Sequence, residues 1–444
     1  EPTQPIEFDT ENEDGTTTYT WTNDNPLIGL AASGPEDPTE TTIPSFVVTN
    51  DTFNALVATI EVTPTYTNNG VTCTGNPETF TITVNPAAQV DPVPSQVLCV
   101  GESTDEIVFT TTNTDGTTTY TWTNDNPAIG LAASGPEDAT ATTIPSFVVT
   151  NDTTSALVAT IEVTPTYENN GVICVGDPET FTIKVNPGAQ VDPIVSQVLC
   201  VGNSTDEIVF TTINTDGTTT YAWTIDNTDI GEDLEASGSG DIPSFVVTND
   251  TTNALVATIE VTPTYTNNGF SCVGESETFT ITVNPGAQVN PVVSQEICPG
   301  DSTEAIEFET TNTDGITTYT WTNDNTEFGL DASGDGNIDS FTPSLVTTSQ
   351  IATIVVTPTY ENDGVTCEGN PETFTITVNP EAQVEPVTSQ VLCVGDTTEE
   401  IEFTTINTDG TTTYTWTNDN PAIGLAESGP EDPLLTATTI PSFV

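Results

Sequence analysis

Any chemistry in this 444-residue sequence has to come from carboxylates, hydroxyls and thiols, because basic side chains are almost absent. There are 66 Asp and Glu residues, no His, no Met, and a single basic residue, Lys184. General acid–base catalysis most often uses His, and nucleophiles are usually activated by a neighbouring base. Carboxylate pairs occur throughout so acidic a chain and therefore mark no particular site. We predict that the protein is not an enzyme.

The cysteines are the most regular reactive groups. They occur twice in each stretch of about a hundred residues, at positions 73, 99, 174, 200, 272, 298, 367 and 393. The sequence has no Cys-x-x-Cys pair and no His, which argues against a zinc site. Regular cysteine pairs in a Thr-rich chain are typical of disulfides formed in an oxidising compartment.

Two disulfide schemes fit this spacing. The first pairs cysteines within one repeat and joins Cys99 to Cys174, Cys200 to Cys272 and Cys298 to Cys367, leaving Cys73 and Cys393 with partners outside this sequence. The second joins cysteines 26 residues apart across a junction and uses all eight. We favour the first, because in the second an extended strand would carry the chain about 25 Å away before each bond closes.

An Asn-Asp-Asn or similar turn offers oxygen ligands, which calcium prefers. Its central aspartate recurs five times, as Asp24, Asp125, Asp226, Asp324 and Asp419. The loop pattern of an EF-hand is absent, so a solvated acidic turn is the alternative to a calcium site. We expect no other cofactor.

The charge of −65 at neutral pH limits the partners. Phosphate binding needs Lys or Arg to displace counterions, so nucleic acid is not an expected partner. An anionic membrane surface would repel the chain. No run of 18 apolar residues occurs, so we expect no membrane insertion.

Five tryptophans define the repeat. Trp21, Trp122, Trp223, Trp321 and Trp416 are spaced 101, 101, 98 and 95 residues apart. A second block, of the type ATIEVTPTY followed by ETFTITVNP, recurs four times and ends at an Asn-Pro pair. Periods of this length indicate whole domains rather than solenoid units. We predict complete repeats at 87–187, 188–285 and 286–380, with incomplete repeats at 1–86 and 381–444.

Within a repeat, short segments alternate apolar and polar residues and are rich in β-branched and aromatic side chains. We therefore predict an all-β protein, a tandem array of antiparallel β-sandwiches that are immunoglobulin-like in plan. The Trp should lie in the core, and the Tyr of each TPTY motif should be a buried ring with a hydrogen-bonded hydroxyl. The Asp-Gly pairs, beginning at Asp14, Asp115, Asp216, Asp314 and Asp409, are expected to form type I′ hairpin turns.

The blocks SQVLCVG, TTTYTWTNDNP, ATIEVTPTY and ETFTITVNP resemble the PKD-like, immunoglobulin-fold repeats of giant Bacteroidetes surface adhesins, including those of gliding motility. The resemblance covers all five repeats. It implies type IX secretion with a sorting domain beyond residue 444, and a paired cysteine in each domain, which supports the first disulfide scheme. It also implies O-glycosylation at Asp-Ser/Thr-x motifs, which places candidate sites at Thr153, Thr251, Ser302 and Thr397. The near absence of basic residues departs from the family pattern.

These observations predict an extracellular, cell-surface protein: the rod-like shaft of a long adhesin or surface filament that holds a binding tip away from the cell. One alternative is that the repeats themselves bind carbohydrate or protein; another is that they are spacers in a large secreted enzyme. The expected partners are neighbouring repeats of the same chain, together with surface polysaccharide or the export and motility machinery.

Overall fold

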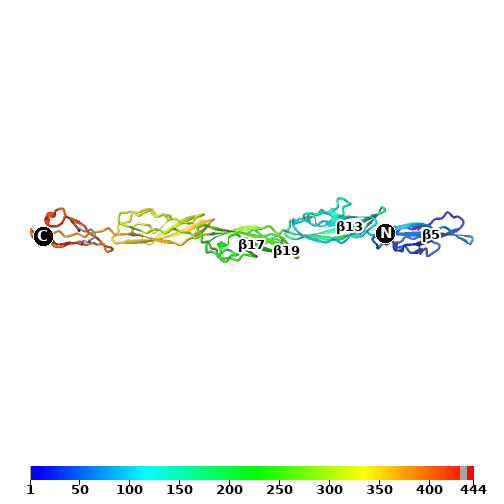
Figure 1. Ribbon diagram of the computed structural model, residues 1–444, viewed down its shortest axis with the longest axis horizontal. Coiled ribbons are helices and arrows are strands. Elements are labelled where there is room, and N and C mark those ends of the chain that lie inside the picture. Colours follow the sequence, from blue (N-terminus) through cyan, green and yellow to red (C-terminus); the bar gives the residue numbers. More distant parts are fainter. Residues whose placement is uncertain (1, 431–437) are drawn as a thin grey trace. The chain divides into compact units, whose positions relative to one another are not determined.

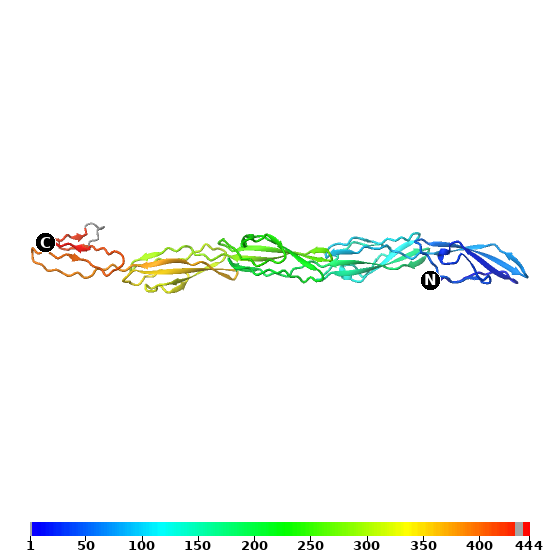
Figure 2. The same ribbon diagram turned by 90° about the horizontal axis from the view of Figure 1, so that it is seen from below.

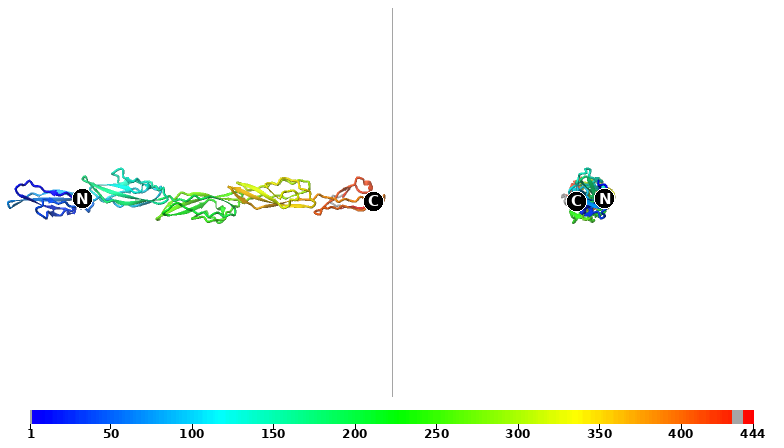
Figure 3. Two further views of the ribbon diagram at one scale, coloured as in Figure 1. Left: turned by 180° about the vertical axis from the view of Figure 1, so that it is seen from behind. Right: turned by 90° about the vertical axis from the view of Figure 1, so that its right-hand side faces the viewer.

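The computed structural model describes residues 2–430 and 438–444. These residues form β-strands joined by loops and short 3-10 turns, which confirms the predicted array of antiparallel β-sandwiches. Figure 3 shows strands and loops in every repeat. By its contacts the chain divides into two compact units. Unit 1 contains residues 1–193, 210–222 and 261–277, and unit 2 contains residues 194–209, 223–260 and 278–444.

The second repeat, in unit 1, shows the complete plan. Its main sheet has the strand order β11-β10-β13-β15-β8, with β14 paired to the far half of β13. All pairs are antiparallel except β8, which runs parallel to β15. A short pair, β9 with β12, forms a second sheet. The bounds are β8 Gln96–Cys99, β9 Ile107–Val108, β10 Thr117–Asn124, β11 Ser134–Gly135, β12 Thr143–Ile144, β13 Leu157–Asn169, β14 Val172–Val175 and β15 Glu179–Asn186.

The first repeat repeats this plan with one difference. Its sheet has the order β3-β2-β5-β6, and β7 pairs with β5. Among the described residues no strand lies on the other side of β7, where β8 lies beside β15 in the second repeat. The bounds are β1 Ile6–Glu7, β2 Thr16–Asn23, β3 Ser33–Gly34, β4 Thr42–Ile43, β5 Leu56–Asn68, β6 Val71–Thr74 and β7 Glu78–Val84.

The later repeats keep the same order. The fourth repeat, in unit 2, has β22-β27-β25-β23-β24 with β26 on β25, and β22 runs parallel to β27. Its strands are β22 Gln295–Ile297, β23 Ile316–Asn323, β24 Ser333–Asp335, β25 Gln350–Asn362, β26 Val365–Glu368 and β27 Glu372–Val378. The third repeat has β16 Gln197–Cys200, β17 Thr218–Ile225, β18 Ser237–Ser239, β19 Leu255–Asn267, β20 Phe270–Val273 and β21 Glu277–Asn284. In the fifth repeat the described strands are β28 Ile401–Glu402, β29 Trp416–Thr417, β30 Ser428–Gly429 and β31 Thr439–Ile440.

The long central strand of each repeat shows why these sequences form sheets. Along β13, Ala159, Ile161, Val163 and Tyr167 are buried, whereas the residues between them are polar and more exposed. A period of two places one face of a strand against the core and the other toward water. The strands β5 and β13, labelled in Figure 1, lie alongside shorter strands of their own repeats in both side views (Figures 1 and 2).

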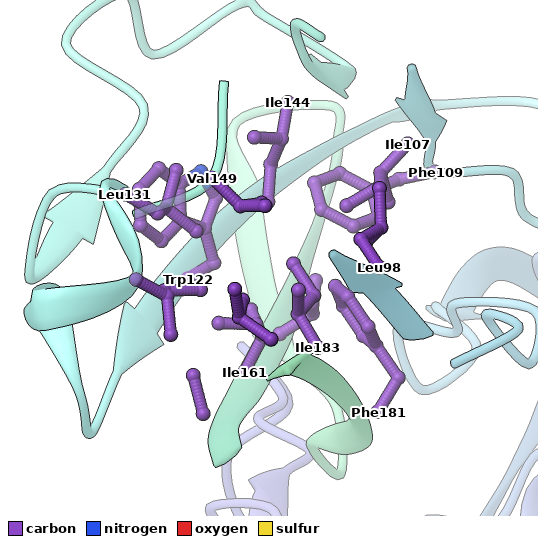
Figure 4. Packing of buried hydrophobic residues seen from close by; sticks show 14 of the residues in the cluster. Leu98, Ile107, Phe109, Trp122, Leu131, Ile144, Val149, Ile161, Phe181 and Ile183 are labelled. Carbon is purple, nitrogen blue, oxygen red and sulfur yellow. The ribbon is translucent and has the colours of Figure 1, made fainter. Parts of the chain in front are cut away.

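The core of the second repeat forms around Trp122, which is 6% exposed. Figure 4 shows Trp122, Ile161 and Ile183 turned inward among the strands. The predicted core position of the tryptophan is confirmed in the first four repeats, and Trp416 is half-buried. The ring lies against Gly135 on the adjacent strand, where a Cβ would come within 2.5 Å of the Trp122 ring atom Cζ2. A glycine is therefore required opposite this tryptophan.

The predicted type I′ turn at the Asp-Gly pairs is wrong. Asp115 has a φ of 61°, but Gly116 does not have the positive φ that a type I′ turn also needs. The pair connects β9 to β10, which belong to different sheets. A Cβ on Gly116 would lie 2.6 Å from the carbonyl oxygen of Glu168, so this glycine is needed for close approach. At Asp14, Asp216 and Asp314 the aspartate likewise has a positive φ and the following glycine does not, whereas at Asp409 only the following glycine has a positive φ.

The hairpin turn with two positive φ angles lies elsewhere, in the Asn-rich segment between β13 and β14. Asn170 has a φ of 51° and Gly171 a φ of 77°. The equivalent pairs begin at Asn69, Asn268 and Asp363. This turn fixes the register that places Cys174 opposite Tyr167.

Candidate functional site: the repeat junctions

The structure contains two disulfides, and each joins one repeat to the next. Cys99 of the second repeat bonds Cys272 of the third, and Cys200 of the third bonds Cys367 of the fourth. The Cα atoms are 5.6 Å and 5.5 Å apart, which is usual for disulfides. The sequence separations are 173 and 167 residues. We call each of these bonds a junction staple.

Both predicted pairing schemes are therefore wrong. The bonds Cys99–Cys174, Cys200–Cys272 and Cys298–Cys367 do not form, nor do bonds between cysteines 26 residues apart. Cys73, Cys174, Cys298 and Cys393 are free thiols in this structure. The prediction of disulfides was correct, but their connectivity was not.

The register of the second repeat gives the physical reason. Leu98, next to Cys99, lies beside Val185, which pairs with Leu157 at the start of β13. Cys174 pairs with Tyr167, ten residues further along the same strand. Ten residues of strand span about 33 Å, whereas disulfide-bonded Cα atoms lie within about 7 Å. The two cysteines of one repeat thus lie at opposite ends of its sheet.

The hairpin that carries the second cysteine also packs closely against the preceding linker. A Cβ on Gly176, just after β14, would lie 1.9 Å from the carbonyl oxygen of Ala88. The equivalent distances at Gly274 to Ala189 and at Gly369 to Ala287 are also 1.9 Å. No other residue fits at these positions without movement of the backbone. These glycines were not among the predicted site residues, although the sequence places a Gly two residues after each hairpin cysteine.

Paired asparagine amides bridge two of the junctions. The Asn85 Nδ2 donates to the carbonyl oxygen of Asn169 at 3.2 Å, and the Asn169 Nδ2 donates to the Asn85 Oδ1 at 3.1 Å. Asn284 and Asn362 form the same reciprocal pair, at 3.1 Å and 3.0 Å. Asn85 directly follows the last strand of its repeat, and Asn284 is the final residue of the last strand of its own. Asn169 and Asn362 each end the long central strand of the next repeat.

The junction that holds the Cys99–Cys272 staple differs. Here Asn267 accepts a hydrogen bond from the Nζ of Lys184 at 2.8 Å, and its amide donates to the carbonyl oxygen of Asp216 and to the hydroxyl of Tyr265. Asn186 is fully buried and its side chain has no hydrogen-bond partner. The single basic side chain of the sequence thus lies at a repeat junction, where it replaces one asparagine pair.

Loop contacts complete each junction. The backbone N–H of Thr114 donates to the carbonyl oxygen of Phe53 at 3.3 Å, and the Thr114 hydroxyl bonds the Asn54 side chain. Thr215 donates in the same way to Thr154 at 2.8 Å, and Thr313 to Thr252 at 3.3 Å. The first four repeats are therefore joined to one another by a hairpin contact and a loop contact as well as by the linker.

The tyrosine of the TPTY motif supports this loop. Tyr167 is fully buried, and its hydroxyl donates to the carbonyl oxygen of Thr114 at 2.9 Å, as predicted. Burial raises the pKa of Tyr167, and the nearby charge of Asp115 raises it further. Tyr360 has a raised pKa for the same reasons, burial first and then the charge of Asp314. These hydroxyls therefore stay protonated as donors.

The aspartate predicted to bind calcium is used in a turn. An Asp125 carboxylate oxygen accepts the backbone N–H of Thr160 at 2.7 Å, and Asn124 bonds the carbonyl oxygens of Leu131 and Ala132. The equivalent bonds occur at Asp24, Asp226 and Asp324. No group of three or more acidic, His or Cys side chains suited to a metal ion occurs in residues 2–430 and 438–444. Calcium binding stays a prediction.

The four candidate glycosylation sites are exposed on loops. The Thr153 hydroxyl is 2.7 Å from the Asn151 Oδ1, and the Thr251 hydroxyl makes the same contact with Asn249. The Ser302 hydroxyl is 2.7 Å from that of Thr342. Exposure makes modification sterically feasible, and glycosylation at Thr153, Thr251, Ser302 and Thr397 stays a prediction. No helix among the described residues is long and apolar enough to cross a membrane.

Comparison with known proteins gave one family match and several remote structural similarities. Residues 197–287 match the model of the PKD-like domain family. A structure of Drosophila N-cadherin EC1–4 aligns over 84% of this chain and 94% of its own, with 13% identity and a TM-score of 0.27. The human desmocollin-1 ectodomain aligns over 98% and 88%, with 12% identity and a TM-score of 0.24. No curated protein sequence matches the chain. The third repeat is thus similar to the PKD-like domain, and the other repeats share its strand plan.

Proposed function

We propose that this chain is part of the shaft of a long extracellular adhesin, and that the junction staples make the shaft resistant to extension under load. The observation that carries the proposal is that each disulfide joins successive repeats rather than closing a loop within one repeat. A disulfide within one domain limits the extension of that domain alone. A bond between domains resists their separation.

The two staples overlap along the chain, and this overlap gives them a mechanical role. Cys200 lies between Cys99 and Cys272, so the second loop begins inside the first. The shortest covalent path from Cys99 to Cys367 passes through both bonds and the 72 residue steps between Cys200 and Cys272 (272 minus 200). Without the staples the path has 268 steps (367 minus 99).

The extracellular location follows from the same bonds. Disulfides persist in oxidising compartments and are rare where glutathione keeps thiols reduced. The net charge of −65 disfavours self-association of the shaft and binding to anionic surfaces. The likeness to Bacteroidetes adhesins supports type IX export, a role in gliding motility and a binding tip elsewhere on the protein. We also propose that the chain has no catalytic role, since His and Arg are absent.

Single-molecule pulling tests the proposal. Between residues 99 and 367, an unstapled chain can extend to roughly 90 nm at ~3.4 Å per residue, whereas the stapled path allows only about 25 nm. We expect the oxidised chain to stop near the shorter limit and the reduced chain to reach the longer one. The double variant Cys99→Ser with Cys200→Ser is the matched control and should behave as reduced under both conditions.

Two results would overturn the proposal. Equal extension of the oxidised and reduced chains would show that the staples carry no load. A compact particle in small-angle scattering of the oxidised chain would be incompatible with a shaft, whatever the pulling data show.

A further inference from the structure

Each junction staple passes over other cysteines along the sequence. The staple from Cys99 passes over Cys174 and Cys200 before it closes. The staple from Cys200 to Cys367 also passes over two cysteines. Cysteines that are neighbours in the sequence are therefore not bonding partners, and some step in the formation of the protein has to select the pairs.

An unfolded chain would select different pairs. The probability that a flexible loop closes falls with about the 3/2 power of its length. Cysteines such as Cys174 and Cys200 are 26 residues apart (200 minus 174), whereas the two staples span 173 and 167 residues. The shorter pairs therefore meet roughly 15–20 times more often in the unfolded chain. Oxidation before folding would close bonds that the structure does not contain.

The folded repeats, in contrast, hold the correct pair together through contacts that need no disulfide. Gly274, two residues after Cys272, packs directly against the backbone of Ala189. Across the same junction the Lys184 Nζ donates to the Asn267 Oδ1 at 2.8 Å. The junction of the second staple has its own glycine contact and an asparagine pair. None of these contacts uses a thiol, so all of them are available to the reduced chain.

The two cysteines of a staple differ in burial. Cys99 ends β8 and Cys200 ends β16, and both are half-buried. Cys272 and Cys367, on the hairpin strands β20 and β26, are each 2% exposed. The Cys99 Sγ lies 3.6 Å from the carbonyl oxygen of Ser271, to which a thiol can donate a weak hydrogen bond. A reagent in solution therefore reaches the cysteine at the strand end before it reaches the cysteine on the hairpin.

We propose that each staple closes only after its two repeats have folded, with the strand-end cysteine as the entry thiol and the hairpin cysteine as the resolving thiol. The Cys99 thiolate attacks an oxidant of the glutathione-disulfide class, forms a mixed disulfide and releases one thiol. The Cys272 thiolate then attacks the Cys99 sulfur, which closes the staple and releases the second thiol. Two protein thiols are oxidised, and one oxidant disulfide is reduced to two thiols.

Cys200 and Cys367 have the same roles in the second staple. Because the folded junction selects the pairs, this route needs an oxidant but no disulfide isomerase. The inference goes beyond the proposed function, since it concerns how the staples form rather than the load that they carry.

Oxidation of the reduced 444-residue chain in native buffer and in concentrated urea tests the order of events. Oxidised glutathione is the oxidant in both conditions, acid stops the exchange, and peptic peptides are mapped by mass spectrometry without reduction. In native buffer we expect the Cys99–Cys272 and Cys200–Cys367 bonds. In urea we expect bonds between cysteines 26 residues apart to exceed the staples by at least about tenfold. Tryptophan fluorescence reports whether the reduced chain is folded before the oxidant is added.

Single substitutions test the two thiol roles. Cys272→Ser should retain glutathione on Cys99, because the resolving thiol is gone. Cys99→Ser is the matched variant, in which we expect Cys272 to take up glutathione at least about tenfold more slowly than Cys99 does in Cys272→Ser. Both variants keep the cysteines of the Cys200–Cys367 staple, and closure of that bond shows in the same molecule that the rest of the chain has folded.

Three results would overturn the proposal. The first is a reduced chain that is unfolded in native buffer, or that oxidises there to other pairs. The second is formation of the staples in urea as readily as in native buffer, because selection would then not require the folded junction. The third is an equal rate of glutathione uptake at Cys99 and Cys272 in the two variants. In each case the pulling experiment still tests the shaft, because it depends on the finished bonds alone.

Discussion

At the scale of single residues, the buried tyrosine hydroxyls hold the junction loops. Tyr167 donates to the carbonyl oxygen of Thr114, and Thr114 in turn contacts the preceding repeat through Phe53 and Asn54. Sequence spacing indicated a buried ring with a bonded hydroxyl. It did not indicate that the accepting loop is also a junction contact, because that depends on where the next repeat lies.

We expect Tyr167→Phe to destabilise the chain by about 1 kcal/mol near neutral pH, because the carbonyl of Thr114 loses its donor. The variant should also change the pH dependence. The folded pKa of Tyr167 is raised above the ordinary value of 10.0, so its stabilisation is fully present below that pH and is lost as pH rises through the folded pKa.

Denaturation midpoints in guanidinium at about pH 8 and about pH 11 measure this effect. The loss of stability between the two conditions should be smaller in Tyr167→Phe than in the unmodified chain. Tyr66→Phe is the comparison, since Tyr66 makes a similar bond to Glu13 but its ring is only half-buried. An unchanged alkaline loss in the Tyr167 variant would contradict the assignment.

At the scale of elements, glycines permit contacts that the strand pattern alone does not reveal. Gly135 on β11 faces the Trp122 ring, and Gly116 lies against the backbone at Glu168. Neither has a positive φ. Their role is therefore close packing, and this is why an interpretation of Asp-Gly as a hairpin turn failed.

We expect Gly135→Ala to destabilise the second repeat by about 1–3 kcal/mol, because its Cβ would meet the buried Trp122 ring at 2.5 Å. Gly188→Ala is the control. Its Cβ would lie 3.6 Å from the Val100 Cγ1, an ordinary contact, so the change should stay within about 0.5 kcal/mol. Chemical denaturation followed by tryptophan fluorescence measures both, and equal effects would contradict the packing argument.

At the scale of the whole molecule, the two staples determine how the chain is connected, and the single basic residue allows a direct test. Trypsin can cut only after Lys184, which lies between Cys99 and Cys272. If the free thiols are blocked and the chain is then unfolded in urea, we expect cleavage to leave the two pieces joined. Reduction should release them. Electrophoresis with and without reductant shows the difference.

Variants make the trypsin test specific. Cys272→Ser should let the pieces separate without reductant, because the Cys200–Cys367 bond lies wholly within the C-terminal piece. Cys174→Ser should have no effect, which distinguishes the staple from a Cys174–Cys200 bond. Separation of the unmodified chain without reductant would instead support pairing of Cys99 with Cys174.

The sequence by itself determined the repeat period, the all-β class, the core tryptophan and the buried tyrosine. These follow from local alternation and from residue volume, which act over a few neighbouring positions. It also predicted that disulfides form, from the number and regularity of the cysteines, and four of the eight cysteines are paired in the structure. The same reasoning limited the available chemistry, since absent side chains can be counted directly.

Only the tertiary structure decided which cysteines meet. The parallel pairing of β8 with β15 places Cys99 at the end of the sheet that faces the following repeat, and the β13–β14 hairpin places Cys174 at the other end. Strand direction and strand order are set by the packing of the whole repeat, and sequence spacing carries no record of either. The disulfides therefore close between repeats, across about 170 residues, because distance in space rather than distance along the chain determines which thiols can bond.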